Sequence, residues 1–159
     1  MHKKLVALSV AAAFLAASSS ADAYPVPDGG ITAQEVASVM QAKGFVADID
    51  KDADGDPRIK SATDGGSFYV YFYGCHGGPR CSAIQFESAF HLKDGMTLVQ
   101  INQWNKSHRF GRAYLDDVMD PYVEMDLDVE HGFLTEGLAN NLDTWIALLP
   151  DFKKFIGWQ

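Results

Sequence analysis

The stretch Ser67–Tyr73 reads SFYVYFY, and its strict alternation predicts a β-strand whose two faces differ in chemistry. One face is apolar and consists of Phe68, Val70 and Phe72. The opposite face consists of three tyrosines, Tyr69, Tyr71 and Tyr73. We expect the apolar face to pack against a core. The tyrosines either form a contact face for a second copy of the chain or lie under helices.

Segments on both sides of this stretch also carry strand signals. The first four strands are joined by short links rich in Gly, Asp and Pro, which favours an antiparallel meander. Two more strands follow a central helix and enclose a turn that ends at Pro121. The six expected strands are 45–50, 58–63, 67–73, 83–92, 110–116 and 122–130.

Three segments have apolar residues at helical spacing. The first opens with a T-x-x-E capping box at Thr32–Glu35 and ends at Gly44. The third is expected to end at Pro150, with a further turn over 151–156. The order α-β-β-β-β-α-β-β-α predicts an α+β fold and not alternating βαβ units. The three helices are expected over 33–43, 96–107 and 138–149.

The N-terminus has the three-part pattern of a secretory signal peptide. A basic start precedes the apolar run Leu5–Ala17, and Ala21–Ala23 is an A-x-A cleavage site. The apolar run is too short for a membrane span of about 20 residues. We therefore expect an exported, periplasmic or secreted protein. Its segments are a signal peptide over 1–23, a flexible arm over 24–30 and a single domain over 31–159.

Charge and composition exclude several classes of protein. Removal of residues 1–23 takes away two lysines and one aspartate, which changes the net charge from −8 to −9. A chain this acidic is a poor ligand for nucleic acid and is repelled by anionic membrane surfaces. A hydrophobic content of 47% is too high for a disordered chain.

The two cysteines, Cys75 and Cys81, agree with export. In an oxidising compartment an even number of cysteines indicates a disulfide, and the Gly-Gly-Pro between them allows the chain to turn. His76 and His91 raise the alternative of a zinc site. Zinc sites usually offer four ligands in two tight pairs, however, and this spacing does not. The sequence therefore favours the disulfide over a metal.

The segment Asp50–Asp56 (DKDADGD) matches the opening of a calcium loop. The candidate ligands are Asp50, Asp52, Asp54 and Asp56. The match fails at its twelfth position, where Ser61 replaces the expected glutamate, and no helix signal flanks the loop. We interpret the segment as an acidic turn between two strands, with weak calcium binding as the alternative.

No catalytic constellation is evident, and we expect a non-enzymatic protein. The acidic row on the last strand is interpreted as its solvated face. The cysteines are expected to be bridged, and the histidines have no Ser or Asp neighbours in a recognisable arrangement. The G-x-S-x-G, G-x-G-x-x-G and P-loop motifs are missing, so no cofactor is implied. The row consists of Glu124, Asp126, Asp128 and Glu130.

The most distinctive stretch is Asn102–Asp116 (NQWNKSHRFGRAYLD), at an expected helix-to-strand junction. A structural role is available: Trp104 can bury its ring, and Asn105 and Arg109 can satisfy backbone groups at the helix end. A binding role is the alternative, because Trp and Arg are enriched at interface hot spots. The candidate binding residues are Asn102, Trp104, Asn105, Arg109, Phe110 and Arg112.

This stretch, followed by an E-M-D-L-D strand, resembles the YbjN-like family of bacterial proteins, which is described as sensory transduction regulators. The resemblance implies a type III secretion chaperone-like fold, with helices on a curved antiparallel sheet, and a protein-interaction module that is often dimeric and has no cofactor. Many relatives are cytoplasmic, whereas this chain carries an export signal. The resemblance rests on Asn102, Trp104, Asn105, Arg109, Phe110, Ala113–Asp116 and Glu124–Asp128.

These observations predict an exported regulatory domain that acts by contact with a protein partner, which includes a second copy as a possible homodimer. Binding to nucleic acid and insertion into a membrane are not expected. The alternative is a periplasmic protein that binds calcium or a small ligand through Asp50–Asp56 or an aromatic groove.

Overall fold

The structure is a computed structural model that describes residues 23–158. The expected signal peptide lies outside the described residues except for Ala23. The α+β class and the order of the expected elements are confirmed. Two short strands, β1 (Ile31–Thr32) and β5 (Arg80–Cys81), were not expected.

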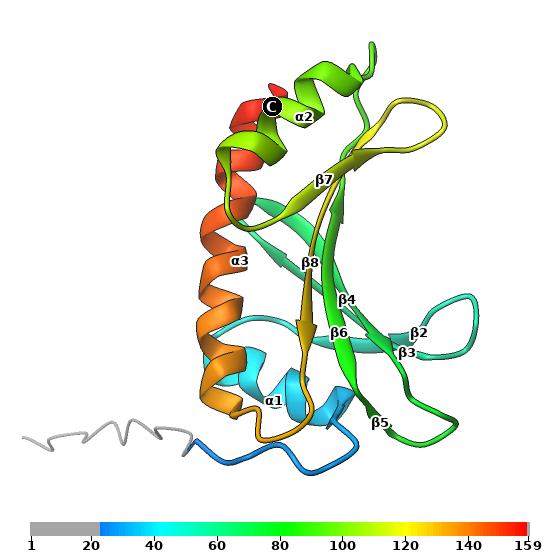
Figure 1. The fold of residues 1–159 in the computed structure, drawn as a ribbon, viewed down its shortest axis with the longest axis vertical. Coiled ribbons are helices and arrows are strands. Elements are labelled where there is room, and N and C mark those ends of the chain that lie inside the picture. The colour runs from blue at the N-terminus through cyan, green and yellow to red at the C-terminus, as the bar shows by residue number, and fades with distance from the viewer. Residues whose placement is uncertain (1–22, 159) are drawn as a thin grey trace, which may run out of the picture.

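The main sheet (Figure 1) has six strands and is antiparallel throughout. Its central strands β4 and β6 pair along most of their length, and β2 and β7 form the two edges. In spatial order the strands are β2 (Asp48–Lys51), β3 (Pro57–Thr63), β4 (Gly66–Tyr73), β6 (Ala83–Ala89), β8 (Pro121–Asp128) and β7 (Arg112–Leu115).

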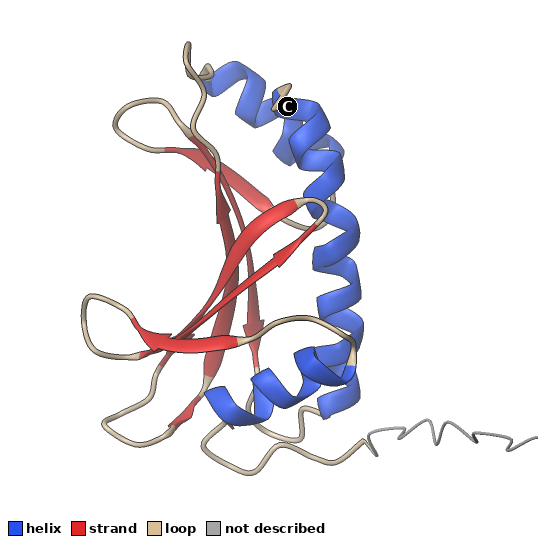
Figure 2. Ribbon diagram, turned by 180° about the vertical axis from the view of Figure 1, so that it is seen from behind, coloured by secondary structure: helices blue, strands red, loops and turns tan. Residues whose placement is uncertain are grey.

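One face of this sheet is covered by helices. Helix α3 (Thr135–Ile156) runs along it, with α1 (Ala33–Ala42) near one end of α3 and α2 (Leu98–Ser107) near the other (Figures 1 and 2). Within residues 23–158 no helix lies on the opposite face. The two faces of the sheet therefore have different environments.

The core lies between α3 and the central strands. Trp145 of α3 is fully buried and packs against Phe68 of β4 and Phe86 of β6, at ring-centroid distances of 6.0 and 5.7 Å. Phe68, Val70 and Phe72 are buried as expected, at 0%, 0% and 1% exposure. The tyrosines of β4 therefore point away from the helices and do not lie under them.

The sequence suggested that the last helix ends at Pro150 and that a separate turn follows. In the structure, helix α3 instead continues through Pro150 to Ile156. The apolar face of the helix persists beyond the proline, with Phe152 and Ile156 buried, and this burial opposes the helix-breaking effect of the ring. Gly65 lies directly against this part of α3. A Cβ atom at that position would come within 2.7 Å of the Leu149 Cβ, so only glycine allows the approach.

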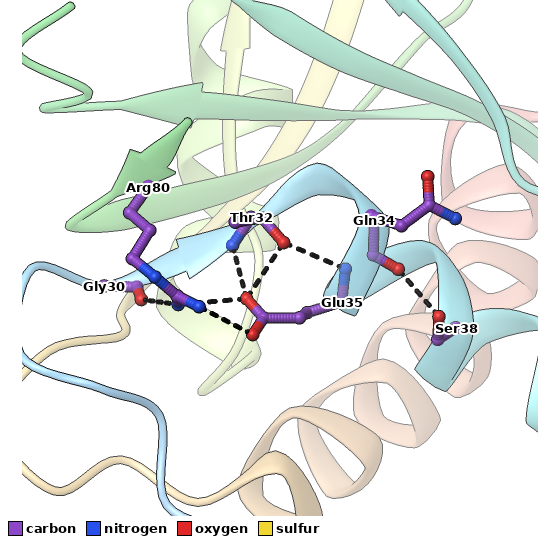
Figure 3. Close-up of polar contacts among 6 residues, drawn as sticks. All are labelled: Gly30, Thr32, Gln34, Glu35, Ser38 and Arg80. Atoms are coloured by element: carbon purple, nitrogen blue, oxygen red, sulfur yellow. Dashed lines mark hydrogen bonds and ion pairs between the residues drawn. The ribbon is translucent and has the colours of Figure 1, made fainter. Parts of the chain in front are cut away.

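A network of polar contacts fixes the start of α1, as Figure 3 shows. Thr32 and Glu35 form the expected capping box: Glu35 N donates to Thr32 Oγ1 at 3.2 Å, and Thr32 N donates to the Glu35 carboxylate at 2.8 Å. Arg80 then donates to Glu35 at 2.9 Å and to the Gly30 carbonyl at 2.8 Å. Since Arg80 belongs to β5, this network ties β5 to α1.

The predicted disulfide between Cys75 and Cys81 is present. It closes the loop that ends in β5, and β5 pairs with β1 through the partners Ile31 and Cys81. Strand β5 is thus held in three ways: by the disulfide, by its pairing with β1 and by the contacts of Arg80. The disulfide therefore helps to hold β5 against β1, a role that the short spacing of the two cysteines did not reveal.

Tyr24 and Val26, which belong to the segment expected to form a flexible arm, contact the start of α3. Val26 is buried and its N–H donates to the Phe133 carbonyl at 2.8 Å. The Tyr24 N–H donates to Thr135 Oγ1 at 3.1 Å. The Pro- and Gly-rich composition suggested a loose segment. Composition cannot reveal a contact with a residue that lies 111 positions away along the chain.

We expect Trp145→Ala to lower the free energy of unfolding by about 3–5 kcal/mol, because it leaves a cavity between β4, β6 and α3. Urea denaturation followed by far-UV circular dichroism measures this loss. Leu98→Ala is the control: Leu98 is 71% exposed, and its truncation is expected to change stability by less than about 0.5 kcal/mol. Equal losses in the two variants would show that Trp145 is not central to the core.

Candidate functional site

The face of the main sheet opposite α3, called the open face below, gathers most of the tyrosines. Strand alternation places them there, because each pairs across the sheet with a residue that also points away from α3. Five of the six tyrosines in the sequence belong to this face. They are Tyr69, Tyr71, Tyr73, Tyr114 and Tyr122.

Glu87 of β6 lies at the centre of this face. The Tyr114 hydroxyl donates to Glu87 Oε2 at 3.4 Å, and the Tyr114 and Tyr122 rings stack at 5.0 Å between centroids. Burial raises the pKa of the Glu87 carboxyl above its ordinary value. Burial, together with the Glu87 charge, raises the pKa of Tyr114 to about 12, so that its hydroxyl stays protonated and able to donate.

Charged pairs flank the tyrosines on both sides. Near one edge, Arg58 binds Asp50 through two hydrogen bonds of 2.7 and 2.9 Å, and its guanidinium lies 4.4 Å from the centroid of the Tyr69 ring. Near the other edge, Arg112 forms an ion pair with the buried carboxylate of Glu124. The open face thus combines tyrosines on β4, β7 and β8 with charged pairs near both of its edges.

Gln85 and Asp126 extend this polar network. Gln85 Nε2 donates to Asp126 Oδ1 at 2.7 Å, and the Tyr73 hydroxyl donates to Gln85 Oε1 at 3.3 Å. Gln85 is buried whereas Asp126 and Tyr73 are exposed. The network therefore presents a hydroxyl and a carboxylate to solvent in fixed positions.

The predicted junction site divides into separate parts in the structure. Trp104 is fully buried, and its indole N–H donates to the Gly111 carbonyl at 2.9 Å. Asn105 does not bind the helix end. Its amide accepts from Ala113 N at 2.8 Å and donates to Ala113 O at 2.9 Å, as a neighbouring strand would. Both residues fix α2 against the edge strand β7.

The remaining junction residues lie on three different surfaces. Asn102 is exposed on α2, and Arg112 belongs to the open face. Phe110 is 50% exposed, and the Arg109 guanidinium lies 5.5 Å from the centroid of its ring instead of on the helix carbonyls. Phe110 borders a shallow pocket of about 330 Å³ between α2 and α3. The pocket is lined by Trp104, His108, Phe110, Thr144, Ala147, Leu148 and Asp151.

The Asp50–Asp56 segment consists of the end of β2 and the β2–β3 turn. Asp52 Oδ1 accepts the backbone N–H groups of Asp54 and Asp56 at 3.0 Å each, and Asp50 is paired with Arg58. These hydrogen bonds direct the Asp52 carboxylate toward the turn itself. Throughout residues 23–158, no three His, Cys, Asp or Glu side chains are grouped so that they could hold a metal ion. In the same range no helix is long and apolar enough to span a membrane.

The sequence indicated the tyrosines of β4 and the acidic row of β8 but did not show that they share one face. Within that row, Glu124 is buried and not solvated as expected. Arg58, Glu87, Tyr114 and Tyr122 come from four strands, and only the register shows that they share one face. The signal was present in the alternation of each strand. The alternation patterns of the separate strands could not be combined into one face without knowledge of which strands are neighbours.

The raised pKa of Glu87 makes stability depend on pH. A carboxyl whose pKa is higher in the folded state favours folding when protonated, and this contribution is lost as pH rises through the folded pKa. We therefore expect Glu87→Gln to be more stable than the wild type at pH 7 and the difference to shrink toward pH 4.

Urea unfolding at several pH values measures the difference. Asp117→Asn, which removes a carboxylate from the exposed β7–β8 loop, is the control and should stay within about 0.5 kcal/mol of the wild type. A Glu87→Gln variant that is less stable than the wild type at pH 7 would contradict the argument.

The comparisons with known proteins give one match. A family model named YbjN, with the description "Putative bacterial sensory transduction regulator", matches residues 32–158. Neither the search of curated proteins nor the search of solved structures found a match. The matched residues include every strand of the main sheet and all three helices. The chain therefore belongs to the YbjN family.

Proposed function

We propose that this protein is a non-enzymatic, exported domain of the bacterial envelope that acts by binding another protein through its open face. The observation that carries the proposal is the open face itself, where five tyrosines and several fixed polar groups lie on a face of the sheet that no helix within residues 23–158 covers.

Tyrosine suits this role for a physical reason. It supplies a large apolar contact area and a hydroxyl at small cost in side-chain entropy, and it is enriched at protein interfaces. On the open face the rings are already held by neighbours, as in the stack of Tyr114 on Tyr122 and the contact of Arg58 with Tyr69. Binding would therefore require little further ordering.

Two features support export. Residues 1–23 have the pattern of a secretory signal peptide, and the Cys75–Cys81 bridge needs an oxidising environment to persist. The family description of a regulator agrees with a protein that acts by contact and not by chemical conversion.

The open face can be tested by capture of partners from envelope extract. The mature chain, with its disulfide intact, is compared with a Tyr71→Ala, Tyr73→Ala variant and with an Arg109→Ala, Phe110→Ala variant. We expect the first variant to retain at least about tenfold less partner, because it removes central aromatic contacts. The second variant, which changes an exposed surface on another side, should retain the wild-type amount.

Circular dichroism and thermal unfolding establish that both variants are folded. The reverse pattern, with loss only in the Arg109 and Phe110 variant, would overturn the assignment to the open face and move the binding site to the pocket between α2 and α3.

Export has a separate test. When the full chain is expressed in a bacterium and the periplasmic fraction is isolated, we expect a protein that begins at Tyr24 and whose mass is lower by two hydrogen atoms than that of the reduced chain. Intact-mass spectrometry before and after reduction measures both properties. An uncleaved chain with free thiols in the cytoplasmic fraction would contradict the proposal of export.

A further inference from the structure

Arg58 shows how the open face binds a guanidinium. The carboxylate of Asp50, on the neighbouring strand β2, accepts two hydrogen bonds of 2.7 and 2.9 Å from Arg58. The same guanidinium lies 4.4 Å from the centroid of the Tyr69 ring and 5.9 Å from that of Tyr71. One carboxylate and tyrosine rings of the next strand thus hold one arginine, through charge, hydrogen bonds and ring contact together.

Arg112 repeats this arrangement at the other edge of the sheet. Its guanidinium forms an ion pair with the carboxylate of Glu124 on the neighbouring strand β8. It also lies 5.9 Å from the centroid of the Tyr114 ring. Both arginines of the open face are therefore bound by a carboxylate together with tyrosine.

Glu87 is a third carboxylate among tyrosines, but it has no cation. It lies directly opposite Tyr69 on β4, and the Tyr114 hydroxyl donates to it at 3.4 Å. Within residues 23–158, no ion pair includes Glu87. Since an ionised carboxylate has sites for about four hydrogen bonds, one long hydrogen bond leaves most of its capacity free.

The other tyrosines of the open face also lie within reach of this carboxylate. Burial raises the pKa of Tyr71, Tyr73 and Tyr122, and the charge of Glu87 raises each of these pKa values further. A charge has such an effect only on groups that lie near it. Glu87 is therefore surrounded by aromatic side chains of β4, β7 and β8.

The chain supplies no arginine of its own to this carboxylate. It contains four arginines, and Arg58 and Arg112 are already bound on the open face. Arg80 is bound at the start of α1, and Arg109 lies beside the ring of the residue that follows it. Lys60 is exposed, and the intervening strand β4 separates it from β6.

Electrostatics favour a cation at Glu87. Hydrogen bonds from Arg58 lower the pKa of Asp50, whereas burial raises the pKa of Glu87 against the opposing effect of the Tyr114 hydrogen bond. A guanidinium beside Glu87 would stabilise its ionised form in the way that Arg58 stabilises that of Asp50. The overall charge of the mature chain, −9, also attracts basic groups.

We propose that Glu87 and the tyrosines around it form a site for an arginine side chain of the partner protein. Arginine is favoured over lysine because its planar guanidinium can bind a carboxylate and stack on aromatic rings at once, and because it is less strongly hydrated than an ammonium. The inference rests on the proposed function, because it takes the open face as the contact surface and names a group that the partner contributes.

NMR titration tests the site without a partner. The mature, disulfide-bonded chain is titrated near neutral pH, at about 0.15 M ionic strength, with N-acetyl-arginine amide as the probe. We expect a dissociation constant on the order of 1–10 mM and shifts of the backbone amides around Glu87 on β6. N-acetyl-citrulline amide, which has nearly the same shape but no charge, should bind at least about tenfold more weakly. The corresponding lysine amide should also bind more weakly than the arginine amide.

Two variants assign the binding to Glu87. Glu87→Gln should weaken binding of the arginine amide at least about tenfold. Since this variant is expected to be more stable than the wild type at neutral pH, unfolding cannot account for the loss, and circular dichroism verifies its fold. Asp126→Asn is the matched control. It removes one carboxylate from the same face, its side-chain oxygen can still accept from Gln85, and it should weaken binding less than about threefold.

Capture of the partner from envelope extract connects the site with the proposed function. The Glu87→Gln variant should retain at least about tenfold less partner than the wild type, and Asp126→Asn should retain nearly the wild-type amount. The arginine amide at about 50 mM, several times its expected dissociation constant, should release the captured partner. The citrulline amide at the same concentration should not.

The inference would be overturned if the arginine amide does not bind, if the citrulline or lysine amide binds equally well, or if Glu87→Gln leaves binding unchanged. Equal losses for Glu87→Gln and Asp126→Asn would also overturn it, because they would indicate general attraction by the acidic chain. If capture depends on Tyr71 and Tyr73 but not on Glu87, the arginine site is refuted and the proposed function stands. If capture is lost only in the Arg109 and Phe110 variant, both proposals fail.

Discussion

The rest of the structure depends on the packing of Trp145 against Phe68 and Phe86. These two phenylalanines belong to the central strands β4 and β6, so their contact with α3 decides which face of the sheet is dry. Because successive side chains of a strand point to opposite faces, the neighbouring residues Tyr69 and Glu87 point to the face opposite α3. The open face is therefore a direct consequence of the core, and its chemistry could not be reversed without loss of that packing.

Much of the fold could be predicted because local patterns were strong. The alternation in Ser67–Tyr73 gave the correct face for every residue, and the capping box at Thr32–Glu35 located the start of α1. The errors arose where a long-range contact overrode a local preference. Pro150 remains within helix α3 because Phe152 and Ile156 beyond it are buried. Val26 is held in place because its N–H donates to the Phe133 carbonyl.

The candidate site could be predicted only in part. The junction stretch drew attention because it combines Trp, Asn and Arg, yet Trp104 is buried and Asn105 pairs with the backbone of β7. An edge strand has unpaired backbone groups, and the Asn105 amide satisfies two of them. The distinctive residues of that stretch thus reflect a structural requirement at least as much as recognition. The open face, by contrast, is built from ordinary residues whose grouping depends on register.

The docking of the N-terminal segment against α3 has a consequence for the order of folding. Synthesis proceeds from the N-terminus, so the segments that form β1 to β8 are made before α3, and until then the apolar face of the sheet lacks its longest covering helix. The contacts of Tyr24 and Val26 with the start of α3 also form only at that stage. A chain whose first and last elements complete each other remains without its native core during most of its synthesis. Such a delay would favour the export proposed above, because a polypeptide must be unfolded to pass through a narrow translocation channel.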